Sequence, residues 1–144
     1  MRVQWKQSYT DLCEEIEALQ ARAEGLEEQL KIAYKMCYDG KMPGDSFSRI
    51  PLDKAIESYD SVSTKLSQVY IILNKMKETK ERMEKSIGKL TGLENQVAYR
   101  RTVMRQTIRQ IASDMGYSEG YVRNVSYRIA MDEENQNMRN VTFL

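Results

Sequence analysis

Apolar residues recur along residues 5–37 at alternating intervals of four and three positions, and this pattern constrains the fold more than any other feature of the chain. The stripe comprises Trp5, Tyr9, Leu12, Ile16, Leu19, Ala23, Leu26, Leu30 and Ala33, and Cys37 continues it. A repeat of this kind held over about four heptads is typical of a long helix that packs against another helix, in a coiled coil or a helical hairpin. We therefore expect one buried seam along this helix and charged residues on its other faces.

A second stripe with the same spacing occupies residues 52–90. It consists of Leu52, Ile56, Tyr59, Val62, Leu66, Val69, Leu73, Met76, Lys80, Met83, Ile87 and Leu90. Between the stripes, at about 39–51, glycines and prolines favour a loop. Two long helices joined by a short loop pack antiparallel. Residues 1–90 are thus predicted to form a coiled-coil-like helical hairpin, whose remaining apolar surface meets a second copy or the C-terminal part of the chain.

Residues 91–131 differ from the hairpin in both composition and period. Three short helices fit this stretch, at about 93–105, 107–115 and 118–131. Thr107 and Gln110 form a capping box, and Gly116 suits a left-handed helix end. The last residues, 132–144, are polar, and we expect them to form a frayed tail. The sequence predicts an all-α protein, in which a long antiparallel hairpin is followed by a three-helix module.

Charge is distributed unevenly, although the net charge of the whole chain is only +1. Residues 63–131 hold 13 basic and 6 acidic residues, whereas residues 1–62 hold 8 basic and 12 acidic ones. A basic second half is consistent either with a polyanionic partner or with ordinary solvated helix faces.

Residue types that many active sites need are lacking. The chain has no histidine, which excludes Ser-His-Asp and Cys-His catalysis and the common histidine-containing zinc sites. Its two cysteines cannot alone complete a four-ligand zinc site, and its glycines form no phosphate-binding loop. We expect no enzyme activity, no catalytic or metal-binding residues and no cofactor. An apolar run of about 18 residues and a signal-like N-terminus are also lacking, so a cytoplasmic protein without membrane contact is expected.

Residues 108–127 have the spacing of a helix-turn-helix. Ala112 is a small residue where two helices would approach, Gly116 lies four positions later at the turn, and Val122 follows six positions after that. Ile111 and Val125 add to an apolar interior between the helices. A short helix-turn-helix in a basic segment is typical of DNA-binding proteins, and the alternative is a helical module that only packs.

The stretch that contains this motif resembles region 4 of bacterial sigma factors. The resemblance is carried by Leu93-Glu-Asn-Gln-Val-Ala-Tyr-Arg-Arg101, Thr107-Ile-Arg-Gln-Ile-Ala-Ser-Asp-Met-Gly-Tyr-Ser118 and Tyr121-Val122-Arg123. With Leu19-Gln-Ala-Arg-Ala-Glu24 in the hairpin, the chain is similar over residues 5–131 to a phage-encoded family near the RinA and ArpU late-transcription regulators of Gram-positive phages. The family pattern has Gly-Leu and Glu-Glu where this chain has Arg105-Gln106 and Arg109-Gln110, which makes the region more basic.

The helical period assigns roles to the residues of the expected recognition helix. Val122, Val125 and Ile129 face inward. The predicted contacts with base edges are Ser118, Glu119, Tyr121, Arg123, Asn124 and Tyr127. The predicted contacts with phosphate groups are Arg105, Thr107, Arg109 and Arg128. Arg123 and Asn124 are the main candidates for reading sequence, because arginine pairs with guanine and asparagine with adenine in the major groove. Gly120 lowers the helix propensity of this segment, which is consistent with a helix that becomes ordered on DNA or with a lost DNA contact.

The motif and the resemblance together imply a sequence-specific transcription regulator of phage or prophage type, which binds double-stranded DNA in the cytoplasm of a bacterial host cell. The hairpin would then serve for homodimerisation or for contact with host RNA polymerase. A dimer would place two recognition helices on half-sites about one duplex turn apart. The alternative is a coiled-coil interaction module that binds a host or phage protein and does not bind DNA.

Overall fold

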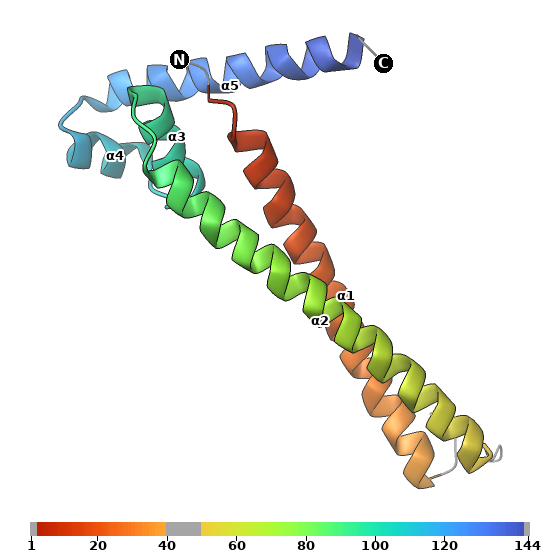
Figure 1. The fold of residues 1–144 in the computed structure, drawn as a ribbon. Helices are drawn as coiled ribbons and strands as arrows, with labels where there is room; N and C mark the ends of the chain where they lie inside the picture. Colours follow the sequence, from red (N-terminus) through yellow and green to blue (C-terminus); the bar gives the residue numbers. More distant parts are fainter. Residues whose placement is uncertain (1–2, 40–49, 143–144) are drawn as a thin grey trace. The chain divides into compact units, whose positions relative to one another are not determined.

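The computed structural model describes residues 3–39 and 50–142, and these residues form five α-helices and no strands (Figure 1). The helices are α1 (Lys6–Asp39), α2 (Leu52–Gly88), α3 (Leu93–Thr102), α4 (Ile108–Met115) and α5 (Glu119–Thr142). The prediction of an all-α fold, with a long hairpin followed by a C-terminal helical module, is confirmed. Most of the predicted loop, residues 40–49, lies outside the described residues. None of the described helices combines the length and the apolar character that a membrane span requires.

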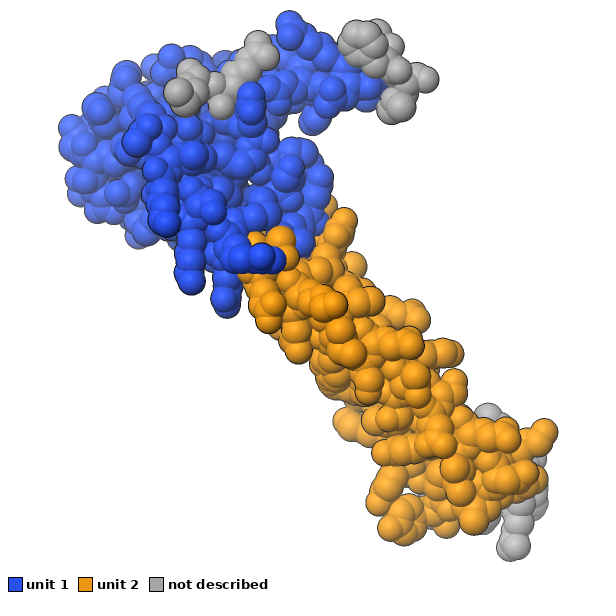
Figure 2. Space-filling model, in the orientation of Figure 1, with its two compact units in different colours: residues 1–12, 80–144 blue, residues 13–79 orange. Residues whose placement is uncertain are grey.

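The chain divides into two compact units (Figure 2). Unit 1 comprises residues 1–12 and 80–144, and unit 2 comprises residues 13–79. This division differs from the predicted boundary near residue 90. The start of α1 and the end of α2 group with the C-terminal helices, because their side chains contact residues of that region rather than only each other.

Unit 2 contains the antiparallel part of the hairpin. Its core is formed by Ala23, Leu26, Leu66 and Val69, against which Leu19, Leu30 and Val62 pack. All of these residues belong to the two predicted seams. The Tyr70 hydroxyl group donates a hydrogen bond to the Glu27 carboxylate, and the rings of Tyr34 and Tyr59 lie 6.4 Å apart. Because later residues of α1 meet earlier residues of α2, the two helices run in opposite directions.

The predicted second seam is buried in the middle of α2 and at Ile87, but it is exposed at the start of the helix and at Leu90, which follows the helix. Leu66 is 8% exposed, whereas Leu52, Ile56 and Leu90 are 60%, 45% and 41% exposed. At the start of α2, Ala55 takes the inward position and is fully buried. The prediction that the buried seam extends from Leu52 to Leu90 is therefore wrong at both ends. A stripe with a period of 3.5 residues drifts around a straight helix of 3.6 residues per turn, so Leu52 and Ile56 leave the contact, whereas Leu90 is exposed because it follows Gly88, the last residue of α2.

Unit 1 has a separate core, to which the start of the chain contributes. The buried members are Val3, Val97, Ala98, Ile111, Ala112, Val122, Val125 and Ile129. Trp5, the first member of the predicted hairpin seam, packs against this core. Its Nε1 donates to the Oδ1 of buried Asn95 at 3.3 Å. The other seven buried members lie in α3, α4 and α5, and the N-terminal segment adds Val3 and Trp5 to the core that these helices share.

Helix α5 continues to Thr142, so helix replaces the frayed tail predicted after residue 131. The extension contains no glycine or proline that would end it. It is also anchored, because Lys6 Nζ lies 3.0 Å from Glu133 Oε2 and the two side chains are only 27% and 23% exposed. These residues are 127 positions apart in the sequence, so no local sequence pattern predicts the pair.

Candidate nucleic-acid interface

Helix α5 separates apolar from polar side chains along its first turns. Val122 and Val125 are fully buried and Ile129 is 4% exposed, as the helical period predicts. Arg123 and Asn124, which alternate with them, are exposed. Burial of the branched side chains sets the rotation of α5 about its own axis. Packing therefore decides which polar side chains the helix presents to solvent.

The turn between α4 and α5 is built around Gly116. Its φ of 75° and ψ of 26° are left-handed, a conformation that glycine adopts without the steric cost of a Cβ. The backbone N–H groups of Gly116 and Tyr117 both donate to the Ala112 carbonyl oxygen. Ser118 then caps α5, since its Oγ accepts from the Tyr121 backbone N–H at 3.2 Å. The predicted left-handed helix end is confirmed, and these bonds hold the entry into α5.

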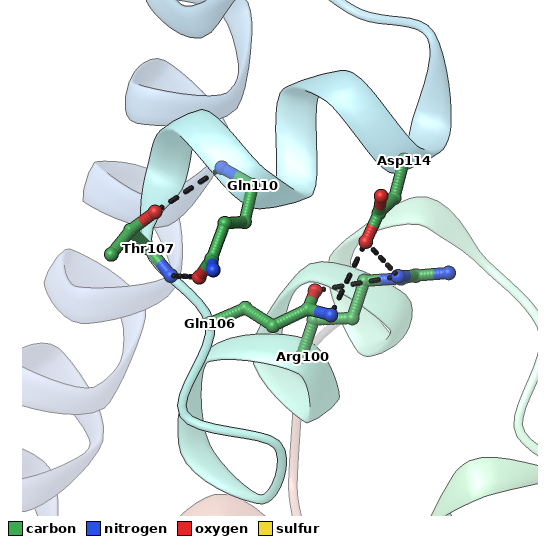
Figure 3. Close-up of polar contacts among 5 residues, drawn as sticks. All are labelled: Arg100, Gln106, Thr107, Gln110 and Asp114. Atoms are coloured by element: carbon green, nitrogen blue, oxygen red, sulfur yellow. Dashed lines mark hydrogen bonds and ion pairs between the residues drawn. The ribbon is translucent and has the colours of Figure 1, made fainter.

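The predicted capping box at the start of α4 is present (Figure 3). The Gln110 backbone N–H donates to Thr107 Oγ1 at 3.2 Å, and the Thr107 backbone N–H donates to Gln110 Oε1 at 2.9 Å. The box satisfies N–H groups that have no partner within the helix. Arg105, just before it, has a φ of 54°, and this left-handed conformation costs a residue with a Cβ about 1–2 kcal/mol. The turn thus presents an exposed arginine beside a capped helix start.

A polar network that the sequence analysis missed holds the same turn (Figure 3). Arg100 Nη1 lies 3.3 Å from Gln106 Oε1 and 3.4 Å from Asp114 Oδ2, and Gln106 Nε2 donates to the same aspartate oxygen at 3.2 Å. The Gln106 backbone N–H also donates to the Arg100 carbonyl at 2.9 Å. These partly exposed contacts are individually weak, but together they connect α3, the turn and α4. Their spacing matches no local motif, so only the folded chain reveals them.

All ten predicted DNA contacts are exposed. The predicted base contacts Ser118, Glu119, Tyr121, Arg123, Asn124 and Tyr127 lie on α5 or at its cap. Of the predicted phosphate contacts, Arg105 and Thr107 precede α4, Arg109 lies in α4, and Arg128 lies in α5. Arg109 Nε and Glu119 Oε1 approach to 3.9 Å, with side chains that are 88% and 53% exposed. An ion pair of this kind contributes little and leaves both groups accessible to a ligand.

Gly120 lies within α5, in the middle of this exposed surface. Its φ angle is not positive, so its backbone is not left-handed, and a Cβ added there meets nothing within 4 Å. Neither turn geometry nor packing therefore requires glycine at this position. In the part of the chain that the structure describes, no group of three or more cysteine, aspartate or glutamate side chains is arranged to hold a metal ion.

Comparison with known proteins finds no match: no protein-family model matches the chain, and no curated protein or solved structure is significantly similar to it. The function is therefore inferred from the geometry and chemistry of the two units.

Proposed function

We propose that this protein is a sequence-specific transcription regulator of phage or prophage type, which binds double-stranded DNA through α4 and α5 and uses its hairpin for dimerisation or for contact with host RNA polymerase. One observation carries the proposal. The buried faces of Val122 and Val125 orient α5 so that Arg123, Asn124 and Tyr127 are exposed together on its other side.

Base readout follows from the chemistry of these side chains. An α-helix fits the major groove of B-DNA, where each base pair presents a distinct set of donors and acceptors. The Arg123 guanidinium group can donate two hydrogen bonds to guanine O6 and N7. The Asn124 amide can pair with adenine N6 and N7, and the Glu119 carboxylate can accept from cytosine N4. Sequence preference in the proposal therefore rests mainly on Arg123 and Asn124.

Phosphate contacts supply most of the affinity in this proposal. Arg105, Arg109 and Arg128 are exposed cations around the two helices. Thr107 Oγ1 and Ser118 Oγ accept the capping bonds, so each hydroxyl group can still donate its hydrogen to an acceptor such as a phosphate oxygen. Each neutralised phosphate contributes about −0.9 to the slope of log binding constant against log salt concentration, so three arginines imply a slope of about −3 per module.

Fluorescence anisotropy with labelled duplexes tests the proposal. The pure protein is titrated, across a salt series, into random duplex and into the DNA upstream of its own gene. We expect binding to both, with tighter binding to the upstream DNA and a slope of about −3 for each engaged module. A folded, helical protein that does not bind duplex even at low salt would overturn the proposal and favour an interaction module for a host or phage protein.

Variants separate sequence readout from general charge. Arg123→Ala combined with Asn124→Ala should bring the ratio of upstream to random affinity close to one, because the remaining contacts carry no sequence information. Arg101→Ala is the matched control, since it removes an exposed arginine from α3 that is not a predicted contact. It should leave the ratio unchanged. A double variant that keeps the preference of the wild type would refute the assigned roles.

A further inference from the structure

The end of the hairpin, formed by residues 31–38 of α1 and 52–60 of α2, keeps large apolar side chains on its surface. Tyr38, Leu52, Tyr34 and Ile56 are 76%, 60%, 52% and 45% exposed. Leu52 and Ile56 continue the apolar stripe of α2 in the sequence, yet among the residues that the structure describes they stay exposed. The apolar stripe is therefore longer than the contact that α1 provides.

These side chains form one continuous surface across the two helices. The ring of Tyr34 lies 5.0 Å from that of Tyr38 and 6.4 Å from that of Tyr59. Leu52, Ile56 and Tyr59 follow each other at intervals of four and three, so they share one side of α2. The interaction with Tyr38 is also the main reason that the pKa of Tyr34 is raised. We call Tyr34, Tyr38, Leu52, Ile56 and Tyr59 the hairpin-end face.

A groove beside this face has room for side chains of a partner. It has a volume of about 450 Å³, and it is lined by Leu30, Ile32, Tyr34 and Tyr59 together with three charged residues of α1, Glu28, Lys31 and Lys35. Tyrosine is enriched at the centres of protein interfaces, because its ring buries a large area while its hydroxyl group keeps a polar contact.

The charges around the hairpin-end face are opposite on the two helices. Residues 31–38 hold two lysines and no acidic residue; Lys31 Nζ lies 3.1 Å from the Glu28 carboxylate of the same helix, so the charge argument rests on Lys35. Residues 52–60 hold three carboxylates, Asp53, Glu57 and Asp60, and one lysine. A second copy rotated about an axis parallel to the hairpin places its α2 on α1 of the first copy, so unlike charges meet. Rotation about an axis across the helices would place α1 on α1 and bring the lysines together.

We propose that the hairpin-end face is a homodimer interface, in which residues 31–38 of each copy pack on residues 52–60 of the other about a two-fold axis parallel to the hairpin. The same patch serves both copies, as a two-fold interface requires, and four helices together cover the apolar side chains. This assignment deepens the part of the proposed function that gives the hairpin to dimerisation. It does not depend on DNA binding and is tested without DNA.

Sedimentation velocity over a concentration series measures the dimer directly, in reducing buffer because Cys13 and Cys37 are free thiols. The wild type should dimerise, and Ile56→Asp should raise the dissociation constant about a hundredfold, since each dimer carries the change twice. Ile71→Asp is the matched control. Ile71 is also an exposed isoleucine of α2, at 57%, but it lies about 22 Å further along the helix. This control should change the dissociation constant by less than about threefold, a loss of well under 1 kcal/mol.

Charge reversal tests the choice of axis. Lys35→Glu and Glu57→Lys should each weaken the dimer severalfold, and the two changes combined should restore it, because the reversed charges meet again across the axis. Circular dichroism of each variant confirms that helical content is retained. A wild type that remains monomeric at high concentration would overturn the proposal and mean that other residues of the chain or another protein cover the face. Dimerisation that survives Ile56→Asp, or a combined charge variant that does not recover, would also refute it.

Discussion

Alanine at the two glycines that flank the start of α5 should change stability in opposite directions. An added Cβ meets nothing within 4 Å at either Gly116 or Gly120, so steric overlap does not contribute to either effect. What differs is the backbone, which is left-handed at Gly116 and helical at Gly120. Alanine in the left-handed conformation costs about 1–2 kcal/mol. Alanine is favoured over glycine by up to about 1 kcal/mol in a helix, the full value applying to the interior, whereas Gly120 lies in the first turn of α5.

The two variants should therefore differ by about 1–3 kcal/mol in free energy of unfolding, with the wild type between them. Urea denaturation followed by tryptophan fluorescence is a suitable assay, because the chain has one tryptophan and Trp5 packs against the core of unit 1. Gly116→Ala should lower the midpoint without changing the slope of the transition, and Gly120→Ala should raise it.

Either of two results would refute this reasoning. If Gly116→Ala is as stable as the wild type, the turn between α4 and α5 does not need a left-handed residue. If Gly120→Ala is destabilised, residue 120 is not part of a regular helix. The Gly120→Ala variant also informs the DNA proposal, because weaker DNA binding by a more stable protein would indicate that the duplex approaches the backbone at that position.

Three further outcomes are expected. Arg105→Gly should stabilise unit 1 by about 1 kcal/mol, because glycine relieves the left-handed strain, and it should weaken duplex binding in anisotropy titrations; a destabilised variant would contradict this. Val125→Ala should cost about 2 kcal/mol in urea denaturation, since Val125 is fully buried, whereas Tyr127→Ala on the exposed side of α5 should stay within about 0.5 kcal/mol of the wild type. Lys6→Ala removes the ion pair between Lys6 and Glu133, so it should lower the helical content measured by circular dichroism through fraying of residues 132–142. Hydrogen exchange that stays unchanged over these residues would argue against the anchor.

Much of this protein is determined by interactions between residues close in sequence. The heptad spacing that contains Leu26 and Leu66 predicts two long helices with one buried side each, because residues three and four apart share a helix face. The capping box of Thr107 and Gln110 and the left-handed Gly116 predict where α4 begins and ends. The exposed surface of α5 follows in the same way, since burial of Val122 and Val125 leaves the intervening side chains in solvent.

Tertiary structure decided which surfaces cover those faces. Trp5 continues the seam of α1 by spacing, but it packs against the core of unit 1 and bonds to Asn95, 90 positions away. Leu52 and Ile56 have the spacing of seam residues and remain exposed, because Ala55 takes the inward position. Lys6 pairs with Glu133, and Arg100 pairs with Asp114. Their sequence separations are 127 and 14 residues, and each pair joins different helices, so no pattern within one helix predicts them. A helical repeat determines that a side chain needs a partner on a given face, whereas the identity of that partner depends on how distant segments fit together.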